Sequence, residues 1–173
     1  RQERVRSQLR RYRTPQVVDL IASKGGSMEL GGVLQPVTVL FADIRGFTSL
    51  SEQMDAREVV DLLNDYFAVM TAAIFQSNGT LDKFIGDCVM ALFGAPIPSD
   101  RSPRNALVAA VRMQQQVARL GAERVERGLA PLRIGIGLHH GPAVVGNIGS
   151  DERLQSTAIG DTVHIAARCG CRP

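Results

Sequence analysis

The sequence lacks the features that define several protein classes. It contains no tryptophan, only 5% aromatic residues, and three cysteines among 173 residues. No apolar run approaches the roughly 18 residues of a membrane-spanning helix, so we expect a cytoplasmic domain, whose parent protein can still be membrane-anchored. Cys88, Cys169 and Cys171 have neither metal-site nor redox-motif spacing, which fits a reducing compartment.

A charge pattern for nucleic-acid binding is also missing. The net charge is +3, but residues 1–24 contain seven Lys/Arg and two acidic residues, so the rest of the chain has a net charge of −2. The globular part therefore has no basic footprint for a phosphate backbone, and we expect no nucleic-acid partner. With 45% apolar and 21% charged residues, the composition is that of one globular domain with a sizeable core.

The first 30 residues differ from the remainder. Val5, Leu9 and Tyr12 follow a helical spacing on an arginine-rich background, which is typical of a paired signalling helix and equally of a solvated tail. We expect residues 1–30 to form a linker helix that follows an upstream sensor domain, and residues 31–173 to form the globular domain.

The globular part alternates between strand-like and helix-like patterns. The sequence predicts strands at 37–44, a hairpin at 80–94 that turns at 86–87, two strands within 132–149 around a turn at 140–142, and helices from residue 55 and from residue 102. This order predicts an α+β fold, a ferredoxin-like sandwich with helices packed on a mostly antiparallel sheet.

Two acidic residues are expected to meet at the centre of that sheet. Asp43 ends the first strand and Asp87 lies in the hairpin turn, and a ferredoxin-like order makes those strands neighbours. Converging carboxylates repel each other unless they share a divalent cation, and an open site of oxygen ligands suits Mg²⁺ or Mn²⁺. Taken alone, Asp87 is explained as well by ordinary turn chemistry.

The loop "IRGFTS" after Asp43 leads from a strand towards a helix. Free backbone N–H groups at Gly46, Phe47 and Thr48 would bind triphosphate oxygens there. An ordinary tight turn also explains the glycine. His139 and His140 have no third ligand at suitable spacing, and we interpret them as structural.

Three ordered segments, "FADIRGFTSLSE", "LDKFIGDCVMALFGAP" and "GLHHGPAVVGNIGSDERLQSTAIGDTVHIAAR", resemble the signature blocks of class III nucleotidyl cyclase catalytic domains. The resemblance covers residues 36–168. It implies the class III cyclase catalytic fold, ATP as substrate, two Mg²⁺ or Mn²⁺ ions per active site, and a homodimer with its active sites at the interface.

The resemblance also implies roles for single residues. It places metal ligands at Asp43, Asp87 and the Ile44 carbonyl, a base-recognition pair at Lys83 and Thr157, a transition-state arginine at Arg168, and His164 at a position where the family usually has asparagine. An ammonium such as that of Lys83 can donate to adenine N1, and a hydroxyl can accept from the adenine amino group. By the two-residue period of a strand, Lys83 should share a face with Leu81 and Ile85; alone, it could be a surface lysine.

The sequence therefore predicts an adenylate cyclase that converts ATP to cyclic AMP and pyrophosphate. Two alternatives stay open. A weak or regulatory cyclase-like subunit is suggested by His164 and by the end of the chain soon after Arg168, where the family continues. A guanylate cyclase is disfavoured by Lys83, because an ammonium cannot accept a hydrogen bond from guanine.

Overall fold

The computed structural model describes residues 31–150 and 153–171, so the expected linker helix of residues 1–30 lies outside the described residues. The elements are β1 (Gly31–Ile44), α3 (Phe47–Ser51), α4 (Ala56–Gln76), β2 (Thr80–Ile85), β3 (Cys88–Phe93), α5 (Ser102–Glu126), β4 (Ile134–Ser150), β5 (Arg153–Ile159) and α6 (Asp161–Gly170). The strands form one sheet in the order β2-β3-β1-β4-β5, and each of these pairings is antiparallel. The predicted α+β fold is confirmed.

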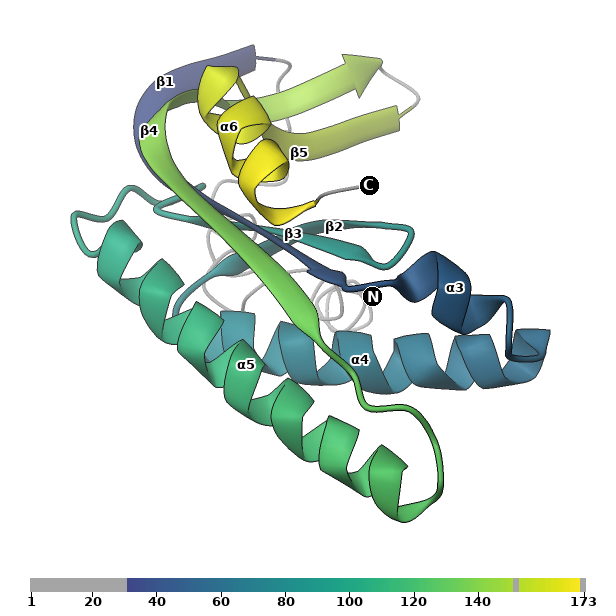
Figure 1. The fold of residues 1–173 in the computed structure, drawn as a ribbon. Coiled ribbons are helices and arrows are strands. Elements are labelled where there is room, and N and C mark those ends of the chain that lie inside the picture. The colour runs from purple at the N-terminus through teal and green to yellow at the C-terminus, as the bar shows by residue number, and fades with distance from the viewer. Residues whose placement is uncertain (1–30, 151–152, 172–173) are drawn as a thin grey trace, which may run out of the picture.

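Helices α4 and α5 cover one face of the sheet, which we call the helix face (Figure 1). Alternate β1 residues, Leu40, Ala42 and Ile44, are buried there among side chains of both helices. Helix α4 begins at the predicted position with a capping box, in which the Asp55 carboxylate accepts from the Glu58 N–H and the Glu58 carboxylate accepts from the Asp55 N–H. None of the described helices combines the length and the apolar character that a membrane crossing requires.

The opposite face of the sheet, which we call the α6 face, is covered in part by the short helix α6 (Figure 1). Val37, Val39 and Phe41 of β1 are buried on it together with Ala166 of α6. Helix and sheet approach very closely here, because a Cβ atom added to Gly137 of β4 would overlap the backbone of Gly170. Small residues therefore set the position of α6.

Strand β4 corrects one sequence-based expectation. The turn predicted at residues 140–142 does not exist, because β4 continues through Pro142 and pairs with all of β1. Pro142 lies directly opposite Pro36, and at this position neither strand has a neighbour on its other side, since β3 pairs with β1 only from Thr38 and β5 pairs with β4 only from Val144. A proline is tolerated in a strand where its missing N–H faces no partner.

Candidate active site

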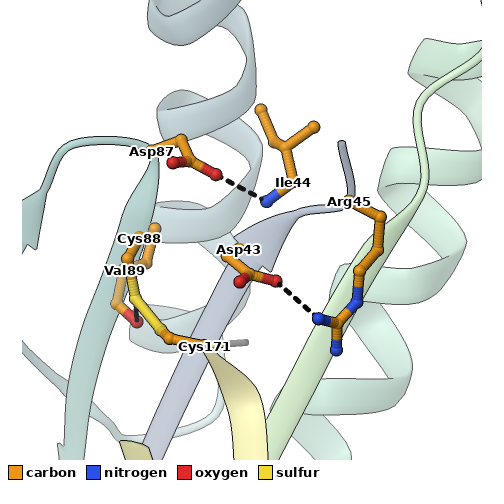
Figure 2. Close-up of a disulfide and its surroundings, with 7 residues drawn as sticks. All are labelled: Asp43, Ile44, Arg45, Asp87, Cys88, Val89 and Cys171. Atoms are coloured by element: carbon orange, nitrogen blue, oxygen red, sulfur yellow. Dashed lines mark hydrogen bonds and ion pairs between the residues drawn. A yellow bond between two sulfur atoms is a disulfide. The ribbon is translucent and has the colours of Figure 1, made fainter. Parts of the chain in front are cut away.

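The first part of the site is a pair of acidic residues, Asp43 and Asp87, which we call the acidic corner. Asp43 lies at the end of β1 and is 7% exposed. Asp87 lies in the β2–β3 turn, and its Oδ2 accepts a hydrogen bond from the Ile44 N–H at 2.9 Å. Figure 2 shows both carboxylates near the end of β1, with that of Asp87 directed at the Ile44 N–H and that of Asp43 at Arg45. The predicted convergence of these residues is confirmed.

Strand register brings these two residues together. The β1–β3 pairing ends with Ala42 opposite Val89, so the next residue of β1 lies beside the turn that precedes β3. Gly86 has a φ of +60°, a conformation that favours glycine and lets a two-residue turn close the hairpin. The predicted hairpin therefore fixes the position of Asp87.

A basic side chain lies over the acidic corner. The Arg45 Nη1 lies 3.6 Å from Asp43 Oδ1 (Figure 2), and the arginine side chain is 39% exposed. Its guanidinium passes directly over Gly135, the residue of β4 that pairs with Asp43, because a Cβ atom at Gly135 would overlap it. An ion pair this exposed contributes little stability, so Arg45 can move aside at small cost.

Tyr66 of α4 is buried on the helix face, and the charges of the acidic corner affect its pKa. Its pKa is raised above the usual range, first by burial and then by the negative charges of Asp87 and Asp43. The Tyr66 hydroxyl is buried and has no hydrogen-bond partner among the described residues. Both carboxylates therefore produce a negative potential that favours cations in this part of the fold.

This arrangement fits a divalent cation held partly by its substrate. Among residues 31–150 and 153–171 no group of three or more His, Cys, Asp or Glu side chains could hold a metal ion, so the protein offers two carboxylates. Mg²⁺ is usually bound in this way, by one or two carboxylates together with phosphate oxygens and water. The role of the Ile44 carbonyl as a further ligand stays a prediction.

The loop after β1 has the expected turn into a helix. Gly46 has a φ of +68° and precedes α3, a helix of only five residues. The Phe47 side chain packs against the core of the helix face, whereas Thr48 is exposed. Any contact of this loop with phosphates would therefore use backbone N–H groups of the first helical turn, which have no partner within the helix.

The second part of the site contains the two predicted base-recognition residues. The Thr157 hydroxyl of β5 donates to Asp82 Oδ2 at 2.9 Å, and Lys83 Nζ lies 3.4 Å from the same oxygen. We call Asp82, Lys83 and Thr157 the base cluster. It joins β2 and β5, the first and last strands of the sheet, so the sheet curls until these strands meet.

A β-bulge in β2 corrects the predicted orientation of Lys83. Leu81 pairs with Ala91 and Lys83 pairs with Met90, so Asp82 is an extra residue between these two pairs. Leu81 therefore packs on the helix face, whereas Lys83 lies opposite Met90, a residue buried on the α6 face. The two-residue period fails here, and Lys83 does not share a face with Leu81.

His164 and Arg168 are exposed and lie one turn apart on α6. Neither side chain makes a hydrogen bond or ion pair with the part of the chain that the structure describes. The structure thus brings Asp43 together with Asp87, and Lys83 together with Thr157, but it leaves the two α6 residues facing solvent. Their assigned roles stay predictions.

Sequence reasoning missed a disulfide beside the acidic corner. Cys88 and Cys171 are 83 residues apart and form a disulfide with a Cα–Cα distance of 6.9 Å (Figure 2). The sequence had indicated a reducing compartment because the cysteine spacings matched no motif. The pairing depends on the packing of α6 against β1 and β4, which local spacing cannot reveal. Cys169 is free and exposed.

His140 shows the expected structural contact. Its Nδ1 lies 2.9 Å from the Thr38 hydroxyl, which also lies 3.1 Å from the Ser102 hydroxyl at the start of α5. This polar contact links β4, β1 and α5.

Comparison with known proteins adds to this geometry. A family model described as "Adenylate and Guanylate cyclase catalytic domain" matches residues 32–171. An adenylate cyclase of Anabaena cylindrica is 41% identical over 157 residues, which is 87% of this chain and 30% of that protein. Adenylate cyclase 1 of Rhizobium meliloti is 38% identical over 134 residues, 78% of this chain and 20% of that protein. The chain thus spans less than a third of these curated relatives.

Solved structures agree in fold but differ in their substrates. The adenylyl cyclase CyaB from P. aeruginosa has a TM-score of 0.77 at 38% identity, over 80% of this chain and 72% of that one. The guanylyl cyclase Cya2 has a TM-score of 0.76 at 40% identity, over 80% of this chain and 71% of that one. Overall similarity therefore does not distinguish adenine from guanine, and the choice depends on single residues.

Proposed function

The chain belongs to the family of adenylate and guanylate cyclase catalytic domains, and on that premise we propose that it converts ATP to cyclic AMP and pyrophosphate. The observation on which the proposal depends is the convergence of Asp43 and Asp87 at the end of β1. The ribose 3′-hydroxyl gives its proton to solvent and its oxygen forms a bond to the α-phosphorus. The bond from that phosphorus to the oxygen bridging to the β-phosphate breaks, and pyrophosphate leaves.

The acidic corner would hold the metal ions. Asp43 and Asp87, with the Ile44 carbonyl, would bind two Mg²⁺ or Mn²⁺ ions, which when bound supply Lewis-acid chemistry at the 3′-oxygen and the phosphates. Backbone N–H groups at Gly46, Phe47 and Thr48 would donate to phosphate oxygens. Arg45 would release Asp43 as cations enter, because its ion pair with Asp43 is exposed.

The base cluster would select the nucleotide. Lys83 would donate to adenine N1, and Thr157 would accept from the adenine amino group. Arg168 would donate to oxygens of the α-phosphate as negative charge develops there, and His164 would donate one hydrogen bond to a ribose or phosphate oxygen. These last two side chains are exposed on α6 and available to a nucleotide.

A homodimer would complete each site, with the acidic corner of one protomer facing the base cluster of its partner. An exposed apolar row supports such an interface: Leu34, Val144 and Ile159 are neighbours across β1, β4 and β5 and are 70%, 40% and 49% exposed. The proposal includes an upstream sensor region, since the curated relatives are more than three times as long as the matched segment. It also includes a cytoplasmic location for the domain.

Product analysis tests the activity. The protein is incubated with Mn²⁺ and either ATP or GTP, and cyclic nucleotides are separated by chromatography and identified by mass. We expect cyclic AMP from ATP, and no product from Asp43→Ala, whereas Asp61→Ala, at an exposed acidic position on α4, retains activity. Product from neither nucleotide would contradict the proposal and favour a regulatory subunit, to which His164 points.

A guanylate cyclase is the second candidate, because the Cya2 structure is about as similar to this chain as the CyaB structure is. Product from GTP alone would establish it. Replacing Lys83 with Glu and Thr157 with Cys supplies a carboxylate that accepts from guanine N1–H, so this double variant should move the preference from ATP towards GTP.

A further inference from the structure

We propose that Asp82 is a positioning residue that makes the base cluster select a purine with an amino group at C6 over one with a carbonyl oxygen there. This inference rests on the proposed cyclase function. It adds a residue to the site that neither touches the nucleotide in the roles given above nor belongs to the metal site.

The first observation is the burial of Asp82 behind its two partners. The Asp82 side chain is 1% exposed, whereas the Lys83 side chain is 30% exposed. Thr157 donates its hydroxyl proton to Asp82 Oδ2 at 2.9 Å, and Lys83 Nζ lies 3.4 Å from the same oxygen. Thr157 is 8% exposed, so a ligand that approaches from solvent would meet Lys83 first and Thr157 beside it, and Asp82 would act through them.

The second step concerns the direction of the hydrogen bonds. A threonine hydroxyl has one proton and two lone pairs, and it normally rotates to donate or accept as its partner requires. An ionised carboxylate can only accept, so the bond to Asp82 commits the single proton of Thr157. Towards the ligand, Thr157 then offers lone pairs alone.

Because its proton is used in the bond to Asp82, the Thr157 hydroxyl can accept a hydrogen bond from the group at C6 of the purine but cannot donate one to it. A 6-amino group, as in adenine, donates to Thr157 and completes its hydrogen bonding. A 6-oxo group, as in guanine or hypoxanthine, would place an oxygen against those lone pairs, with no proton between the two acceptors. A site with fixed polarity rejects the wrong partner strongly, because the mismatched groups lose water without gaining a bond.

The bulge in β2 explains how two consecutive residues reach one cluster. In a regular strand Asp82 and Lys83 would point to opposite faces. The extra residue between the pairs Leu81–Ala91 and Lys83–Met90 breaks that alternation. Bulges often redirect a side chain in this way next to functional sites.

The test compares three nucleotides that differ at C6. ATP has an amino group, purine riboside triphosphate has hydrogen, and inosine triphosphate has a carbonyl oxygen. ATP and purine riboside triphosphate share N1, the purine atom that would accept a hydrogen bond from Lys83. The ratio of their kcat/KM values therefore isolates the Thr157 contact. We expect the wild type to prefer ATP over both, and Asp82→Ala to lower the preference over inosine triphosphate by about tenfold, because Thr157 can then rotate. Asp82→Asn, which keeps the side-chain size, should lie between the two.

A double-mutant cycle separates positioning from a merely structural role. Thr157→Val removes the hydroxyl, so adding Asp82→Asn to it should leave the ratio of ATP to inosine triphosphate unchanged. A structural role would instead lower the rates with all three nucleotides equally and leave the ratios alone, which would overturn the proposal. Asp65→Asn, an equivalent change on the exposed surface of α4, is the control and should alter no ratio.

A binding measurement keeps this inference distinct from the activity. If the wild type forms no cyclic product, the proposed function fails, and the same three bases are then compared by calorimetry as α,β-methylene triphosphates, which cannot cyclise. A preference for the amino purine that Asp82→Ala reduces would support the role of Asp82. Equal ratios in the wild type and Asp82→Ala would contradict it.

Discussion

The helix face and the α6 face of the same sheet are packed in different ways. On the helix face large residues such as Leu40, Phe93 and Met113 pack between β1, β3 and α5. The α6 face buries fewer residues, which include Ala166 of α6 beside Phe41 of β1, and α6 approaches the sheet there through the contact of Gly170 with Gly137. One face thus resembles an ordinary core, whereas the other is shaped by close backbone approach.

The candidate site residues belong mainly to the second face. Asp43 continues the alternation of Val39 and Phe41, and Lys83 lies opposite Met90, so both lie on the α6 face. A large aliphatic core is the main source of stability, whereas a charged group is buried at a cost and is retained for function. We therefore expect substitutions on the helix face to change stability, and substitutions among the charged residues of the α6 face to change activity.

The largest effect is expected for Asp43→Asn. The amide keeps the shape of the side chain but removes the charge that binds cations, so product formation should fall by about 10²–10³-fold with either nucleotide. Stability should change little or rise, because the negative charge of Asp87 then has no like charge beside it. Initial rates and the urea midpoint measure the two quantities. A large loss of stability without a loss of activity would reverse the proposed difference between the faces.

Met113→Ala tests the helix face. Met113 is fully buried in the centre of α5, so truncation leaves a cavity and should lower the free energy of unfolding by about 2–5 kcal/mol. Activity per folded molecule should stay close to that of the wild type, because Met113 lies on the helix face and the candidate site residues lie mainly on the α6 face. Gln115→Ala, at an exposed position of the same helix, is the matched control. A specific loss of activity in folded Met113→Ala would show that the two faces are coupled.

The disulfide is expected to be an exception, a feature of the α6 face that changes stability, because it links the end of α6 to β3. Under oxidising conditions Cys171→Ser should lower the free energy of unfolding by about 2–4 kcal/mol, since the Cys88–Cys171 link closes a long loop in the unfolded chain. Cys169→Ser, which alters the exposed free cysteine, should have little effect. Equilibrium unfolding with and without reductant measures both. Three alkylatable thiols in the oxidised wild type would contradict the pairing.

The difference between the faces also explains what the sequence could predict. The helix face depends on local patterns: the capping box at Asp55, the amphipathic α4 and the proline at the start of α5 each lie within a few neighbouring residues. The hairpin turn at Gly86 and Asp87 is equally local, and it was enough to place Asp87 beside Asp43 once the ferredoxin-like strand order was assumed.

The α6 face depends on contacts between distant residues, and the errors lie there. Pro142 indicates a turn locally, but the full register with β1 keeps β4 one continuous strand through it. The bulge at Asp82 and the Cys88–Cys171 pair likewise require strands and helices that local patterns do not relate. One signal was available for Asp82, since two adjacent charged residues inside an apolar strand violate the two-residue period.

The smallest effect is expected for Tyr66→Phe, at the point where the two faces influence each other. The Tyr66 hydroxyl is buried without a hydrogen-bond partner among the described residues, so its removal should raise the free energy of unfolding near pH 8 by about 1 kcal/mol. Burial, Asp87 and Asp43 all raise the pKa of Tyr66 in the folded state. The folded state therefore holds the phenol proton more tightly than the unfolded state does. The stability that depends on this proton is fully present below the unfolded pKa of about 10 and is lost as the pH rises above it.

Urea midpoints measured from pH 8 to pH 11 distinguish the two proteins. The wild type should lose stability more steeply than Tyr66→Phe above about pH 10, because only the wild type must either ionise a phenol beside two carboxylates or unfold. Asp87→Asn should reduce that difference, since Asp87 raises the pKa of Tyr66 more than Asp43 does. If Tyr66→Phe is instead less stable at pH 8, the Tyr66 hydroxyl donates a hydrogen bond in solution. The acidic corner would then be stabilised by a residue of the helix face as well.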